Sequence, residues 1–200
     1  ANIPIKDDPA ANEAAMENVR QDKLREVRAV HDGTWVAHPG LVQVAREAFD
    51  SVLRSPNQLG AMRFDASVGR DDLLRVPGGE VTEAGLRNNI DVAVRYLEAW
   101  LSGTGAVPLY NLMEDTATAE ISRAQVWQWL HHSVRMDDGT LLTPSLFRKY
   151  YSEEMEHIYK TVGPERYRRG QFELASRFFF NLVHESEFTP FLTLKAYQYL

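Results

Sequence analysis

Residues 111–123 of this 200-residue chain read Asn111-Leu112-Met113-Glu114-Asp115-Thr116-Ala117-Thr118-Ala119-Glu120-Ile121-Ser122-Arg123. An apolar run from Gly105 to Met113 leads into two adjacent carboxylates, and a predicted helix begins at once after them. The pattern places an acid at a loop-to-helix junction. Such an acid is either a general base or a carboxylate that only suits the dipole of a helix N-terminus. Which of the two it is decides what the protein does.

From residue 82 onwards the sequence predicts helices only. Thr82 can cap the first of them, and the pair Thr143-Pro144 places a capping residue before proline at a first helical position. Apolar residues recur on one face of each segment with the helical period. The predicted helices span residues 82–101, 116–134, 143–159, 171–184 and 191–199.

Residues 1–55 have a different pattern. A helix is predicted over 12–30, a short β-prone stretch over Thr34–His38, and a second helix over 41–53. Helix, strand, helix is typical of a piece of a βα-barrel, although a single parallel strand has no partners for its backbone groups. Residues 56–81 are loop-like, with room for one short turn at 71–74. We therefore expect a mainly α protein with a barrel-like part (1–55), a linker (56–81) and a helical domain (82–200).

The composition excludes several classes of function. A net charge of −6 argues against a nucleic-acid partner, and the absence of cysteine excludes disulfides, thiolate zinc sites and cysteine nucleophiles. No apolar run approaches the roughly 20 residues of a membrane span, so no membrane partner is expected. No signal peptide is visible, and the chain does not begin with Met. It could therefore be a piece of something longer.

Asp115 is the first candidate for chemistry. Proton removal from a carbon next to a carbonyl needs a base that is held still and partly desolvated, and a loop-to-helix junction can provide this. Acids are nevertheless common in first helical turns, so spacing alone favours a structural role. Spacing also makes Glu114 no better and no worse a candidate.

Three other patterns have ordinary explanations. Glu154 and His157 have the Glu-x-x-His spacing of di-iron bundles, but no second copy exists, so a solvated helix face is the simpler interpretation. The adjacent His131 and His132 point about 100° apart on a helix and cannot chelate together. Trp35 could line a pocket at a barrel mouth, although a Trp in such a stretch is more often core.

Three stretches carry a family resemblance. Residues 32–39 (Asp-Gly-Thr-Trp-Val-Ala-His-Pro), 111–123 and 125–129 (Gln-Val-Trp-Gln-Trp) closely resemble malate synthase of the shorter, A-type branch. Residues 191–197 look like the C-terminus of that family, so the resemblance covers nearly the whole chain. It implies a TIM barrel with a C-terminal helical domain over its mouth, of which residues 1–55 would be the end of the barrel.

The resemblance also implies an activity. The family joins acetyl-CoA and glyoxylate to give malate and CoA in the glyoxylate cycle, using Mg²⁺. Asp115 occupies the position of the catalytic acid/base, Trp35 matches a residue that lines the glyoxylate pocket, and Met113 is expected beside it. Only the resemblance makes Asp115, rather than Glu114, the expected base.

The family's Mg²⁺ ligands and its enolate-stabilising Arg belong to earlier barrel strands, which this chain lacks. We therefore expect the chain to need the remainder of the TIM barrel and to be inactive alone. The alternative is a non-catalytic helical module that docks on a barrel partner. Tyr199-Leu200 is not a Ser-Lys-Leu peroxisomal address, which favours the cytoplasm, although a trimmed C-terminus would hide such an address.

Overall fold

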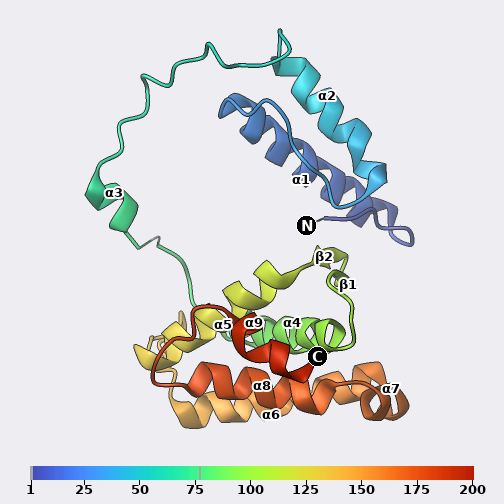
Figure 1. Cartoon of the computed structure of the whole chain (residues 1–200), viewed down its shortest axis with the longest axis vertical. Helices are drawn as coiled ribbons and strands as arrows, with labels where there is room; N and C mark the ends of the chain where they lie inside the picture. The colour runs from blue at the N-terminus through green and yellow to red at the C-terminus, as the bar shows by residue number, and fades with distance from the viewer. Residues whose placement is uncertain (1, 77) are drawn as a thin grey trace. The chain divides into compact units, whose positions relative to one another are not determined.

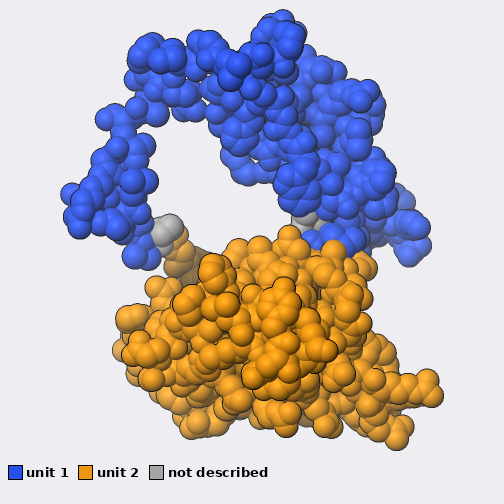
Figure 2. Space-filling view, viewed as in Figure 1, with its two compact units in different colours: residues 1–77, 110–113 blue, residues 78–109, 114–200 orange. Residues whose placement is uncertain are grey.

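The computed structural model describes residues 2–76 and 78–200. They form two compact units, which Figure 2 shows in different colours. Unit 1 comprises residues 1–77 and 110–113, and unit 2 comprises residues 78–109 and 114–200. Within the described residues, no helix combines the length and the apolar character needed to cross a bilayer.

Unit 1 is built on two packed helices, α1 (Pro9–Arg28) and α2 (Val42–Val52), which lie side by side in Figure 1. Asp8 caps α1 by accepting the N–H of Ala11 at 3.0 Å, and Pro9 fits the first helical position because its missing N–H would have no partner there. A 3₁₀ turn, η1 (Pro39–Leu41), leads into α2. The apolar side chains buried in this unit are Ala15, Val19, Val27, Leu41, Ala45, Ala48 and Phe49.

The strand expected at Thr34–His38 does not form. The backbone is extended at His38 (φ −149°, ψ 139°), but residues 34–38 join no ladder or bridge in the described part of the chain. Extended residues become a strand only when a neighbour accepts and donates their backbone hydrogen bonds. Between α2 and α4 the described chain is mostly irregular, and one short helix, α3 (Arg70–Leu74), interrupts it.

Unit 2 is helical and is organised around α4 (Glu83–Leu101), which packs against α5 (Thr116–His131), α6 (Pro144–Val162) and α8 (Phe172–His184) (Figure 1). Burial extends around most of α4, because three helices cover it. The remaining elements are α7 (Pro164–Arg169), α9 (Leu192–Ala196) and the 3₁₀ turn η2 (Tyr197–Tyr199). The helical prediction for residues 82–200 is thus confirmed in its main elements, while α7 was not foreseen.

The predicted caps are the ones the structure uses. Thr82 accepts the N–H of Gly85 at 2.9 Å and Thr143 accepts the N–H of Leu146 at 3.2 Å, so α4 and α6 begin where the sequence indicates. Gly163 ends α6 with φ 82°, a conformation that a side chain would oppose.

A hairpin precedes α5, so the expectation of helices only after residue 81 is wrong there. Strands β1 (Val107–Leu109) and β2 (Leu112–Glu114) pair across a two-residue turn. Tyr110 and Asn111 both have positive φ, 51° and 63°, as a type I′ turn requires. The hairpin delivers the chain to the start of α5.

The segment after α8 is fastened to α5 by one buried side chain. Arg123, 1% exposed, donates from Nη1 to the carbonyl of Thr189 at 2.7 Å and from Nη2 to that of Pro190 at 3.2 Å. Its Nε donates to Glu120 at 2.7 Å, and the other oxygen of Glu120 accepts the N–H of Leu192 at 2.6 Å. These contacts hold residues 189–192 along α5.

Candidate functional site

Asp115 is the N-cap residue of α5. Its backbone is extended (φ −130°, ψ −174°), and Oδ1 accepts the N–H of Ala117 at 2.9 Å. The carboxylate therefore lies at the helix N-terminus, where the unpaired N–H groups and the helix dipole favour a negative charge. The residue is nevertheless exposed. A single side chain thus caps the helix and presents a carboxylate at the surface of unit 2.

Glu114 and Asp115, which spacing could not separate, have different surroundings. Glu114 is 7% exposed, and its Oε2 accepts a hydrogen bond from the Thr118 hydroxyl at 2.5 Å. Glu114 is thus folded back onto the first turn of α5, whereas Asp115 is exposed. Of the two acids, Asp115 is the one that a substrate can reach.

Tyr96 forms a hydrogen bond with Thr116, the first residue of α5. This residue of α4 is fully buried, and its hydroxyl lies 2.8 Å from the carbonyl of Gly105 and 2.8 Å from Oγ1 of Thr116. Burial raises the pKa of Tyr96 and the charge of Asp115 adds to the rise, while the hydrogen bond with Thr116 opposes it. The hydroxyl therefore keeps its proton at neutral pH. Sequence reasoning missed Tyr96, although a hydroxyl on the apolar face of α4 was the available signal.

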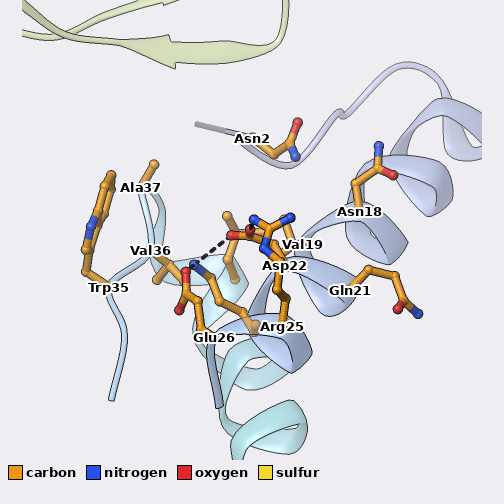
Figure 3. Close-up of a pocket in the computed structure, with 12 residues that line it drawn as sticks. Asn2, Asn18, Val19, Gln21, Asp22, Arg25, Glu26, Trp35, Val36 and Ala37 are labelled. Carbon is orange, nitrogen blue, oxygen red and sulfur yellow. Dashed lines mark hydrogen bonds and ion pairs between the residues drawn. The ribbon is translucent and has the colours of Figure 1, made fainter. Parts of the chain in front are cut away.

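Trp35 and Met113 belong to unit 1, whereas Asp115 belongs to unit 2. Trp35 is 68% exposed and lines a hollow of about 590 Å³ within unit 1. Figure 3 shows Trp35 across this hollow from the α1 residues Asn18 and Asp22. Met113 is half-buried in β2, two residues before Asp115. Trp35 thus borders a hollow within unit 1 and is not a core residue.

The acids of α6 take part in ion pairs. Arg87 of α4 donates to Glu154 at 2.8 Å and to Glu83 at 2.7 Å, and it also binds Glu153. The described residues contain no group of three or more His, Asp or Glu side chains arranged to hold a metal ion. The described residues therefore offer no such ligand cluster for the Mg²⁺ that the resemblance implies, and Glu154 serves an interhelical contact.

His131 and His132 lie at the C-terminal end of α5. His131 stacks on Trp127 with ring centroids 4.0 Å apart, and its Nδ1 lies 2.8 Å from the Trp127 carbonyl. Trp127 in turn donates from Nε1 to the carbonyl of Glu185 at 2.8 Å. His132 is the exposed C-cap residue. The two residues thus lie at the C-terminal end of α5, where the sequence predicts them.

Comparison with known proteins bears on both units. A family model described as "Malate synthase, C-terminal" matches residues 80–200, and one described as "Malate synthase, TIM barrel domain" matches residues 1–76. The chain is 56% identical over 200 residues to a malate synthase of Myxococcus xanthus (strain DK1622), covering 100% of this chain and 37% of that protein.

Plant proteins show a similar match. The chain is 54% identical over 203 residues to a glyoxysomal malate synthase of Zea mays, covering 98% of this chain and 36% of that protein. It is 48% identical over 205 residues to a glyoxysomal malate synthase of Brassica napus, covering 100% of this chain and 36% of that protein. The chain thus spans little more than a third of the length of these relatives.

Proposed function

Because the chain belongs to the malate synthase family, we propose that it supplies the catalytic acid/base of the reaction that converts acetyl-CoA, glyoxylate and water into malate and CoA. The observation that carries the proposal is the position of Asp115. Its carboxylate is exposed and fixed by the cap of α5, within the region that matches the family's C-terminal domain. A carboxylate that is held in place and that a substrate can reach meets the geometric requirement for a general base on a carbon acid.

The proposed chemistry has three steps. The Asp115 carboxylate removes a proton from the acetyl methyl group, which leaves an enolate. The enolate carbon attacks the aldehyde carbon of glyoxylate, a carbon–carbon bond forms, and the resulting alkoxide takes up a proton. Water then hydrolyses the malyl thioester, so that the carbonyl carbon gains the water oxygen and CoA leaves as the thiol.

The two carboxylate oxygens of Asp115 have different roles in this scheme. Oδ1 is engaged by the N–H of Ala117 at 2.9 Å, which fixes the plane of the carboxylate. Among the described residues, none donates a hydrogen bond to Oδ2. Oδ2 is therefore the oxygen assigned to the proton. The cap limits the rotation of the side chain, so less orientational entropy is lost when the methyl group approaches.

We assign glyoxylate recognition to Trp35 and Met113. The ligands of Mg²⁺ and the donor that stabilises the enolate are assigned to residues outside this chain. Mg²⁺ would polarise glyoxylate, but the described residues offer no cluster to hold it. Developing charge on the enolate needs a stabilising donor as well. This requirement leads us to propose that the chain acts together with the remainder of a TIM barrel. The 200 residues alone should release no CoA from acetyl-CoA when glyoxylate and Mg²⁺ are supplied.

The test compares two N-cap variants in a protein that joins this chain to the remainder of a TIM barrel. Asp115→Asn keeps a capping side chain but removes the base, so glyoxylate-dependent CoA release should fall by at least about 100-fold. Asp8→Asn is the matched control, because Asp8 caps α1 in the same manner. It should leave turnover unchanged. Folded Asp115→Asn protein with nearly full turnover would show that another group is the base.

A further inference from the structure

The hydroxyl of Tyr96 joins two points that flank the hairpin. Gly105 precedes β1, Thr116 follows β2, and both lie 2.8 Å from the same buried oxygen. All three residues belong to unit 2. The buried Tyr96 hydroxyl therefore links the residues on either side of the hairpin, Gly105 and Thr116.

The proton positions in this network follow from its partners. A carbonyl oxygen only accepts, so the Tyr96 hydroxyl must donate its single proton to Gly105. Thr116 must then donate its own hydroxyl proton to the Tyr96 oxygen. The chain of donation runs from Thr116 to Tyr96 to Gly105. Both hydrogen bonds involve the phenol oxygen, so neither can be kept when that oxygen is removed.

A second hydrogen bond supports the junction on the other side of Asp115. Glu114, the residue before it, accepts from the Thr118 hydroxyl, and Thr116, the residue after it, is held by Tyr96. Both sequence neighbours of Asp115, Glu114 and Thr116, are thus held by a side-chain hydrogen bond. The direction of its carboxylate is consequently set by the backbone of residues 114–116 and by the bond to Ala117.

We propose that Tyr96 is the positioning residue for Asp115, holding the first residue of α5 to the foot of β1 so that the exposed carboxylate faces the substrate. The inference rests on the proposed function, since it concerns the same base. Tyr96 is fully buried, so its side chain has no surface to offer a substrate. A displacement of about 1 Å at a reacting group can cost on the order of 100-fold in rate.

A matched control separates positioning from ordinary core packing. Tyr150 is 6% exposed, belongs to unit 2, and donates its hydroxyl to Glu83 at 2.8 Å. Glu83 begins α4, thirteen residues before Tyr96 and about 20 Å away along the helix. Tyr150→Phe therefore removes a buried phenol hydroxyl of the same domain far from Asp115.

The experiment measures kcat and KM in a protein that joins this chain to the remainder of a TIM barrel. Tyr96→Phe should lower kcat by about 10- to 100-fold with little change in KM for acetyl-CoA. Deuterium in the acetyl methyl group should slow Tyr96→Phe more than the unmodified enzyme, because proton removal becomes the slower step. Tyr150→Phe should show neither change. Equal kcat values for Tyr96→Phe and Tyr150→Phe would overturn the proposal.

Variants of Thr116 test the same link from its other end. Thr116→Val removes the hydroxyl and should match Tyr96→Phe, while Thr116→Ser restores the donor and should stay close to the unmodified kcat. The double variant of Tyr96→Phe and Thr116→Val should lose no more than either single one, because both break one network. Should Tyr96→Phe fail to fold, the pair Thr116→Val and Thr116→Ser decides: equal kcat values refute the role of this link.

Asp115→Asn is measured in parallel to separate the two proposals. An inactive Asp115→Asn together with a normal Tyr96→Phe refutes positioning and leaves the base assignment intact. An active Asp115→Asn refutes the proposed function and the inference that rests on it.

Discussion

Replacing Arg123 by Met should detach the segment that follows α8 from α5. Met retains the apolar volume but donates no hydrogen bonds, so the carbonyls of Thr189 and Pro190 lose their donors and Glu120 loses its cationic partner. The guanidinium carbon also lies 4.1 Å from the centroid of the Phe188 ring, a favourable cation–π contact that disappears.

The size of the effect follows from burial. Arg123 is 1% exposed while the side chain of Glu120 is 22% exposed, so water can replace part of what Glu120 loses but little of what the two carbonyls lose. Breaking a buried pair from one side typically costs about 3 to 5 kcal/mol, and the partial exposure of Glu120 places this case near 3. For a unit of this size, about 3 kcal/mol corresponds to a fall of roughly 10 °C in Tm.

Thermal and urea unfolding followed by circular dichroism measures the effect. Arg169→Met is the control, because Arg169 pairs with Glu165 at 2.9 Å with both side chains more than 70% exposed. It should change stability by less than about 0.5 kcal/mol. Arg123→Lys should fall between the two, because an ammonium cannot reproduce the forked contacts of a guanidinium. If Arg123→Met were no less stable than Arg169→Met, the assigned role of Arg123 would be refuted.

Three further outcomes are expected. Glu98→Gln should destabilise unit 2 by about 2 to 3 kcal/mol in urea unfolding, because this 2% exposed carboxylate receives two hydrogen bonds from Arg166, at 2.8 and 2.6 Å. Gly170→Ala should also lower Tm, since a Cβ there would lie 2.1 Å from Arg166 and 2.6 Å from Glu98; an unchanged Tm would show that both side chains can move aside. The hydrogen bond from Arg87 holds the pKa of Glu83 below its usual value, with that from Tyr150 adding to the effect. This stabilisation is therefore present above the unfolded pKa of about 4.3 and is lost as pH falls through the lower folded value, so Glu83→Gln should weaken the dependence of Tm on pH below 5.

Helix starts were the most predictable part of this fold. Thr82 and Thr143 each combine a side-chain acceptor with a following apolar period, and both interactions are local. The hairpin was not predictable in the same way, because its strands have three residues each and its turn contains no glycine. Likewise, residues 34–38 have β-prone side chains, yet strand formation depends on a neighbour that sequence pattern cannot supply.

The candidate site also combines local features that the sequence predicts with features that depend on tertiary contacts. The sequence by itself determined that an acid stands where α5 begins, because capping and helix propensity act within a few residues. It could not choose between Glu114 and Asp115 by spacing, and it gave Tyr96 no role. Only the tertiary structure buried Glu114 against Thr118, left Asp115 exposed, and placed the hydroxyl of a residue from α4 beneath the junction. The physical reason is that exposure and long-range hydrogen bonds are set by the packing of α4 against α5.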